Sequence, residues 1–281
     1  MALGRGEGLA PDSGDNRSTK RVASLVNEAV LTHTLRLWGP LVRQVIEHVS
    51  ATPNDGLVLD AGCGTARGLD SEGTFVGHIV GVDINFESLL KARRNCPQLN
   101  LVVADLERLP FADATFAGAF SVSVLQYVDR ERALSETARV LKPGAPVAFA
   151  ENLHGSPVAR CYRLAHRVLH LRYGPYLVPR AHLKWEECEN IFDRHFRVLS
   201  VTARHLMTTL SYLPVVVRAC LGLPSSRRLG TMPTLNAIDS FILSRAPSVA
   251  RFCWTVSVLA AKEKPDLSPE EVTPQLGRRG Q

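Results

Sequence analysis

Three aspartates, Asp60, Asp83 and Asp105, each close a short apolar run of the sequence. The first is followed at once by the small-residue turn 61–66, which contains two glycines. Glycine lets the backbone turn sharply and lets a ligand approach it closely. A carboxylate beside such a turn suits a positively charged ligand, whereas it would repel the pyrophosphate that a dinucleotide-binding turn holds. The pattern therefore predicts a site for a ligand that carries positive charge.

The elements that must position these acids are the strands of a parallel sheet. The three aspartates are 23 and 22 residues apart, which is the length of a strand–helix repeat in such a sheet. Ligands of open α/β sheets bind at the carboxyl ends of the strands. We therefore expect the three acids to line one edge of a common crevice.

Apolar runs and amphipathic segments alternate along most of the chain, which predicts an α/β protein. Gly39-Pro40 divides the first amphipathic segment into two helices, and Asn85 is suited to cap a helix. Strands are predicted at 57–59, 78–82, 99–103, 117–122, 146–150, 196–201 and 254–261, and helices at 21–50, 67–72, 85–92, 131–141, 157–172 and 185–192.

Charge divides the chain into an acidic and a basic segment. Residues 51–153 carry 9 Lys and Arg against 13 Asp and Glu, whereas residues 154–253 carry 14 against 5. The two segments are expected to have different roles. The hydrophobic content of 45% is enough for a real core.

The cysteines and the N-terminus indicate a cytoplasmic protein. The 6 cysteines include no CxxC pair and no Cys/His cluster with metal spacing, so we expect reduced thiols and no metal site. Residues 1–20 read as a disordered tail without the apolar stretch of a signal peptide. No run of about 18 apolar residues predicts a membrane-spanning helix.

Four motifs together identify a family. They are the stretch 58–65 (VLDAGCGT), the stretch 81–83 (GVD), the stretch 105–116 (DLERLPFADATF) and the stretch 139–144 (RVLKPG). With them the chain resembles the class I S-adenosylmethionine-dependent methyltransferases, in particular the small-molecule branch that includes the quinone-biosynthesis C-methyltransferases. The resemblance covers roughly residues 55–153, and the last two predicted strands also fit it.

The resemblance implies a Rossmann-like, mostly parallel α/β sheet of seven strands in the order 3-2-1-4-5-7-6, with helices on both faces and a helical cap. The expected methyltransferase domain spans residues 21–262, with disordered tails at 1–20 and 263–281. Within it we expect N-terminal helices at 21–50, a cofactor-binding core at 51–153 and cap insertions at 154–195 and 205–253.

The resemblance also implies that S-adenosylmethionine is the cofactor and assigns residues to it. Asp60 and the glycine turn would hold its amino-acid end, Asp83 the ribose hydroxyls, and Asp105 with the Leu106 backbone the adenine amine. The cofactor-binding set is Asp60, Gly62, Cys63, Gly64, Asp83, Ile84, Asp105, Leu106, Ser121 and Val122. Two positions depart from the family pattern. Ala66 replaces a glycine, which a helix start should tolerate, and Ala117 replaces a surface acid.

Residues that follow the fourth and fifth strands are candidates for the acceptor site. Gln126 and Tyr127 are expected to form pocket wall. A base is needed only if the acceptor must lose a proton, and we expect His154 first and His182 second in that role. Methyl transfer itself is an in-line displacement that the protein promotes by positioning and desolvation.

The sequence narrows the acceptor without identifying it. The stretch 121–124 (SVSV) is not the Asn/Asp-Pro-Pro-aromatic turn of amine-modifying DNA methyltransferases, and the paired-glutamate loop of arginine methyltransferases is also absent. The basic, apolar segment 154–253 is consistent with an apolar acceptor that bears an acidic group. It is also consistent with the helix 157–172 and the stretch 206–224 resting on an anionic membrane face, or with a solvated rim over a packed cap.

The residues are compatible with three functional classes. A small-molecule methyltransferase leads. An RNA methyltransferase or RNA-binding protein is supported by the basic segment, but stacking aromatics are few, at 6% of residues, so no nucleic-acid partner is expected. A nicotinamide-dependent enzyme is disfavoured by Asp60 and by Ala66. Nothing in the sequence indicates the oligomeric state.

Overall fold

The computed structural model describes residues 56–66, 69, 78–157, 160, 181–211 and 232–263. The predicted N-terminal tail and N-terminal helices lie outside these residues, as do most of the helix at 157–172 and nearly all of the C-terminal tail. The predicted short helix at 67–72 is described only at Leu69.

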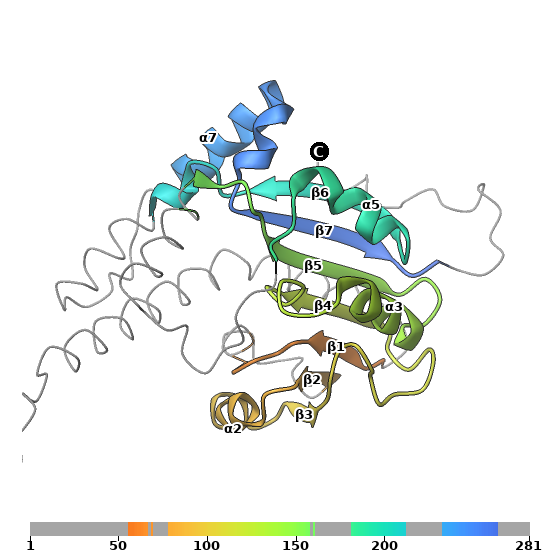
Figure 1. The fold of residues 1–281 in the computed structure, drawn as a ribbon. Coiled ribbons are helices and arrows are strands. Elements are labelled where there is room, and N and C mark those ends of the chain that lie inside the picture. Colours follow the sequence, from red (N-terminus) through yellow and green to blue (C-terminus); the bar gives the residue numbers. More distant parts are fainter. Residues whose placement is uncertain are drawn as a thin grey trace, which may run out of the picture.

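One sheet of seven strands, in the order β3-β2-β1-β4-β5-β7-β6, runs through the described part of the chain (Figure 1). β7 is antiparallel to both of its neighbours, and the other paired strands are parallel. This confirms the expected fold class and strand order. The strands are β1 Val58–Ala61, β2 Ile79–Asp83, β3 Asn100–Val103, β4 Gly118–Val122, β5 Pro146–Asn152, β6 Arg197–Arg204 and β7 Thr255–Ala261.

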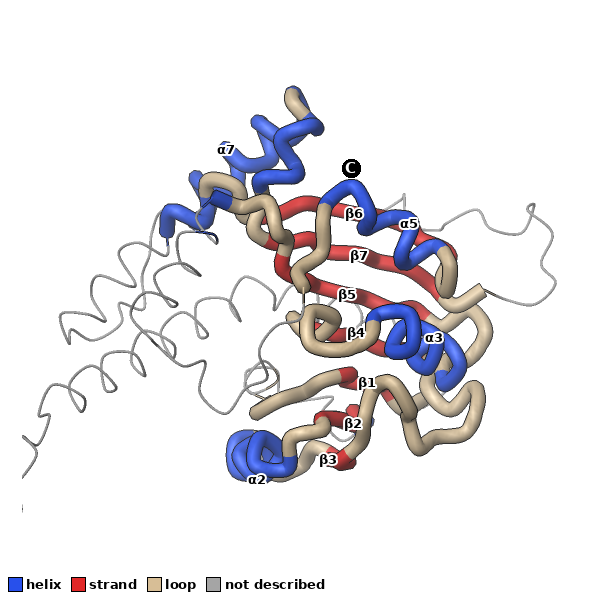
Figure 2. Tube along the Cα trace, viewed as in Figure 1, coloured by secondary structure: helices blue, strands red, loops and turns tan. Residues whose placement is uncertain are grey.

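One helix connects β2 to β3 and another connects β4 to β5, as parallel crossovers require (Figure 2). Asn85 caps α2 as predicted, since its side chain accepts a hydrogen bond from Ser88 N at 3.0 Å. Asp129 caps α3 in the same way from Arg132 N, at 3.2 Å. The helices are α2 Phe86–Asn95, α3 Arg130–Val140, α5 Cys188–Asp193 and α7 Met232–Arg245, with 3₁₀ turns at Trp185–Glu187, Thr208–Ser211 and Pro247–Phe252.

Both faces of the sheet are covered. Alternate residues of a strand point to opposite faces, so neighbours such as Val58 and Leu59 enter different cores. On one face the strands pack against α3 and α5, and on the other against α2. The first core includes Leu59, Ala119, Leu134, Phe149 and Phe192, and the second includes Val58, Phe120, Ala148 and Ala92.

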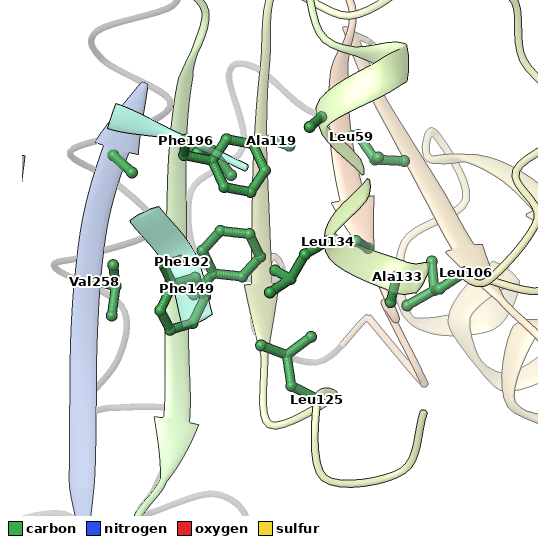
Figure 3. Close-up of a cluster of buried hydrophobic side chains, with 14 of the residues drawn as sticks. Leu59, Leu106, Ala119, Leu125, Ala133, Leu134, Phe149, Phe192, Phe196 and Val258 are labelled. Carbon is green, nitrogen blue, oxygen red and sulfur yellow. The ribbon is translucent and has the colours of Figure 1, made fainter. Parts of the chain in front are cut away.

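The aromatic centre of the first core lies over β5 (Figure 3). The Phe149 ring stands 4.8 Å from that of Phe192 and 5.6 Å from that of Phe196, measured between centroids. All three side chains are fully buried. The segment 185–193 thus packs on the sheet, although the sequence prediction placed it in the cap. The division of the chain into core and cap otherwise stays a prediction.

None of the helices in the described ranges is long and apolar enough to cross a bilayer. In the same ranges no cluster of His, Cys, Asp and Glu could hold a metal ion.

Candidate functional site

The glycine turn after β1 is tied to the neighbouring strand. Gly62 N and Cys63 N both donate to Val82 O, at 2.8 and 2.9 Å. Gly62 has φ +83°, and a Cβ added there would collide with the γ-methyl groups of Val124. This position therefore needs glycine for both its backbone conformation and its packing.

Gly64 in the same turn has a different requirement. Its φ is +52°, but a Cβ added there would meet no atom within 4 Å. The turn thus leaves open space above Gly64, on the side where a ligand can approach the backbone.

Asp60 is a buried carboxylate beside this space. Its residue exposure is 6%, and the described part of the structure gives it no hydrogen-bond donor. Burial, together with the nearby charge of Asp83, raises the pKa of Asp60 from its usual value of 3.8 to about 8. A cationic group of a ligand would supply the compensating charge that the protein itself does not.

Asp83 is the fixed carboxylate of the site. Its Oδ2 accepts from Gly64 N at 2.9 Å, and its Oδ1 accepts from Asn85 N at 2.8 Å. Each oxygen keeps a second lone pair, so the carboxylate can still accept two hydroxyl hydrogens. The exposed side chain of Ile84 lies next to it in the chain and offers an apolar surface.

The loop after β3 carries Asp105 and Leu106. Asp105 Oδ1 accepts from Glu107 N at 2.9 Å, and the Leu106 side chain is buried. Arg139 of α3 anchors the loop by donating to Leu109 O at 3.0 Å and to Phe111 O at 2.8 Å. The arginine of the RVLKPG motif thus holds the DLERLPF motif in place.

At the end of β4, Ser121 is buried and donates through Oγ to Ala61 O at 3.0 Å. This bond joins the last residue of β1 to β4 directly below the glycine turn. Val122 is half-buried beside it. The structure therefore brings Asp60, the glycine turn, Asp83 and Ser121 together at the carboxyl ends of three adjacent strands, with Asp105 following the next.

Two positions in the turn refine the sequence interpretation. Ala66 has φ +54°, so it adopts the left-handed conformation rather than a helix start, and the expectation for this residue was wrong. The left-handed conformation costs a non-glycine residue roughly 1 kcal/mol. Burial, with the charge of Asp60, raises the pKa of the Cys63 thiol, which makes it a packing residue rather than a nucleophile.

The sequence analysis did not single out Glu151, the residue that organises the loop after β4. Glu151 is only 1% exposed, and its Oε1 accepts from Val124 N at 2.9 Å and from Leu125 N at 3.1 Å. Burial raises its pKa to about 7. The available signal was the same as for the aspartates, since Glu151 closes the apolar run 147–150.

The acceptor-site candidates lie on two segments beyond these strands. Gln126 is buried, and Tyr127 is partly buried. His154 and His182 are brought near each other by backbone pairing, since His154 N donates to Leu183 O at 2.8 Å. Their roles remain predictions.

Comparison with known proteins relates the central part of the chain to a family. Residues 59–149 match the family model described as a methyltransferase domain. The O-methyltransferase rstn1 of Aspergillus nomiae is 34% identical over 119 residues, which cover 40% of this chain and 52% of that protein. The demethylmenaquinone methyltransferase of Streptomyces avermitilis is 33% identical over 131 residues, which cover 46% of this chain and 55% of that protein.

Solved structures extend the likeness in fold beyond this region. The geranyl diphosphate C-methyltransferase of Streptomyces coelicolor, solved with S-adenosyl-L-homocysteine, has a TM-score of 0.54 and 16% identity. That alignment covers 81% of this chain and 78% of the other. The chain spans about half the length of the first curated relatives it matches.

Proposed function

We propose, on the basis that residues 59–149 match the model of the methyltransferase domain family, that this chain transfers the methyl group of S-adenosylmethionine to a small acceptor. The acceptor is apolar or lipid-like. Residues of the site would hold this acceptor in line with the carbon–sulfur bond of the cofactor, whose sulfur would leave as a neutral thioether on methyl transfer.

The observation that carries the proposal is the pairing of Asp60 with Asp83 around the glycine turn. Asp60 is buried and has no cationic partner among the described residues, whereas Asp83 is ordered by two backbone amides and retains free lone pairs. A ligand with an ammonium at one end and a ribose diol in its middle fits both carboxylates. S-adenosylmethionine has these groups and supplies the methyl group on a sulfonium leaving group.

Each predicted cofactor residue has a role in this arrangement. Asp60 would bind the ammonium, while Gly62, Cys63 and Gly64 pass beside the amino-acid end. Asp83 would accept the ribose hydroxyls, and Ile84 would cover the adenine ring. Asp105 and the Leu106 amide would bind the adenine edge, and Ser121 and Val122 would support the reacting centre from below.

The acceptor side involves the segments after β4 and β5. Gln126 and Tyr127 would form its wall. His154, or else His182, would take a proton from an acceptor that has to lose one. These segments meet where His154 N donates to Leu183 O, which places both histidines on neighbouring backbone.

We further propose a cytoplasmic location, with peripheral contact to an anionic membrane through the basic segment 154–253. The described cysteines 63, 96, 188 and 253 are all free thiols, as expected in a reducing compartment. Flotation with anionic vesicles at low salt tests the contact, and absence of binding would contradict it.

Calorimetry with S-adenosylhomocysteine and with NAD tests the cofactor assignment. Saturable binding of the first and none of the second is expected, and the reverse result would overturn the proposal. A screen of metabolite extracts with methyl-labelled S-adenosylmethionine then identifies the acceptor. Failure of the protein to bind S-adenosylhomocysteine makes the screen unnecessary, because the enzyme assignment has then failed.

A further inference from the structure

The loop 123–126, between the end of β4 and the segment leading to α3, has a nearly complete set of hydrogen bonds. The amide of residue 123 donates to Ala150 O, and the amides of residues 124 and 125 both donate to Glu151 Oε1. The carbonyl oxygen of residue 124 accepts from Tyr127 N, that of residue 125 from Arg130 Nε, and that of residue 126 from Ala181 N. The Ser123 hydroxyl accepts from Asn152 Nδ2 at 2.9 Å.

One polar atom of this loop has no partner. Gln126 Oε1 is buried with no hydrogen bond. The residue as a whole is 6% exposed. A buried acceptor without a donor is costly, which makes such an atom in an otherwise satisfied loop a candidate for ligand binding.

The orientation of the Gln126 amide follows from its other bond. Nε2 donates to Ser123 O at 3.2 Å. Exchanging the two ends of the amide would place its oxygen against that carbonyl oxygen, and two acceptors repel each other. The oxygen is therefore the free end, and the partner it needs must donate a hydrogen.

The position of the loop indicates which ligand supplies that donor. Val124 contacts the glycine turn at Gly62, so this part of the loop faces the cofactor side. Gln126 lies two residues further from β4, towards Ala181, on the side assigned to the acceptor. A neutral hydroxyl suits it better than a cationic amine, because an amide oxygen accepts a hydrogen bond but carries no charge to balance a cation.

We propose that Gln126 Oε1 accepts a hydrogen bond from a hydroxyl group of the acceptor, so that this site selects hydroxylated apolar molecules over analogues that cannot donate. The proposal rests on the methyltransferase function proposed above and adds the specificity-determining contact. It makes Gln126 a binding residue, with no role in moving a proton.

Matched probes that differ in a single hydrogen-bond donor test the proposal. The affinities of 2-naphthol and of 2-fluoronaphthalene, which has a similar shape but no donor, are measured by calorimetry on the full chain saturated with S-adenosylhomocysteine. We expect the wild-type protein to prefer 2-naphthol by about tenfold or more. The absence of this preference overturns the proposal.

The Gln126→Met variant keeps the volume of the side chain and removes its hydrogen bonding. We expect its preference between the probes to fall to about one, while its affinity for S-adenosylhomocysteine stays within about twofold of wild type. A loss of cofactor affinity with an unchanged preference would assign the oxygen to the cofactor and overturn the proposal.

The Asn152→Ala variant is the matched control. It removes a different hydrogen bond of the same loop, Asn152 Nδ2 to Ser123 Oγ, and leaves the Gln126 amide in place. It should retain the preference for 2-naphthol, and a loss in this variant too would show that loop geometry, rather than Gln126, sets the preference. Wild-type binding of S-adenosylhomocysteine alone decides the enzyme assignment, so the two failures are distinguishable.

Discussion

At the scale of single residues, the site depends on two carboxylates with opposite environments. Asp83 is held by backbone amides, whereas Asp60 is buried with no donor from the described residues. The first environment orders a charged group, and the second makes its charge costly. A ligand cation would relieve that cost, so we expect cofactor affinity to depend strongly on Asp60.

The Asp60→Asn substitution tests this dependence. The amide has the same shape but cannot balance an ammonium, so we expect affinity for S-adenosylhomocysteine to fall at least thirtyfold, about 2 kcal/mol or more. Calorimetry measures the affinity, and circular dichroism checks that the fold is retained. An affinity within threefold of wild type would contradict the assignment of Asp60 to the ammonium.

The pH dependence of stability provides a second test of Asp60. Its folded pKa of about 8 lies above the usual 3.8, so ionisation disfavours the folded, ligand-free protein. The resulting stability is fully present below about pH 4 and is lost as the pH rises through 8. Urea unfolding between pH 4 and 9 should show this decline, and Asp60→Asn should weaken it. Part of the decline remains in the variant, because the raised pKa of Glu151 acts in the same direction.

Glu151 is a positioning residue for the loop after β4. Replacing it with leucine leaves the amides of Val124 and Leu125 without their acceptor, and we expect a loss of about 2 kcal/mol or more in the free energy of unfolding. Glu151→Gln keeps one carbonyl oxygen and should lose much less. Urea unfolding at pH 6 compares the two. Equal losses in both variants would show that the hydrogen bonds from the amides of Val124 and Leu125 do not determine the contribution of Glu151 to stability.

At the scale of elements, the two glycines of the β1 turn have separable functions. Gly62→Ala forces a methyl group into Val124, so we expect a loss of stability of about 1–3 kcal/mol. Gly64→Ala meets no atom within 4 Å, so it should lose only the roughly 1 kcal/mol of stability that the left-handed conformation costs a non-glycine residue, together with cofactor affinity. Urea unfolding and calorimetry on both variants separate these effects. Val124→Ala should partly restore the stability of Gly62→Ala and should not restore the affinity of Gly64→Ala.

Arg139 connects helix α3 to the loop that we propose binds the adenine. It donates to two carbonyls of the 105–116 loop and pairs with Glu136 at 2.8 Å and Asp113 at 2.7 Å. Arg139→Lys keeps the charge but cannot span all four partners. We expect a several-fold loss of affinity for S-adenosylhomocysteine and a smaller loss for methionine, which has no adenine. Equal losses for both ligands would argue against a local effect on the loop.

At the scale of the whole molecule, the sequence predicted the repeated part of the fold well. Three apolar runs that end in aspartate are a redundant pattern, and their spacing placed β1, β2 and β3 correctly. The position of β7 between β5 and β6 followed only from the family resemblance, because no local pattern encodes a pairing between distant segments. Strand order needed that outside information.

Other features could not be predicted from the sequence, because a single residue type occurs in several structural environments. A single acid after a strand, such as Glu151, can cap a helix or can be buried and accept hydrogen bonds from loop amides. The burial of its side chain distinguishes the two roles. The left-handed conformation of Ala66 was missed because alanine usually favours a helix. The open oxygen of Gln126 depends on which neighbours satisfy the rest of its loop, which only three-dimensional structure shows.

The placement of β7 also affects how the chain reaches its folded state during synthesis. β5 pairs along its whole length with β7, from Pro146 with Ala261 to Asn152 with Thr255. Until residue 261 has left the ribosome, the nascent chain holds β5 with one side unpaired, and an unpaired apolar strand invites association with other chains. The parallel strands β1 to β5, which carry the carboxylates, are synthesised first. Their edge at β5 stays unpaired until β7 is added.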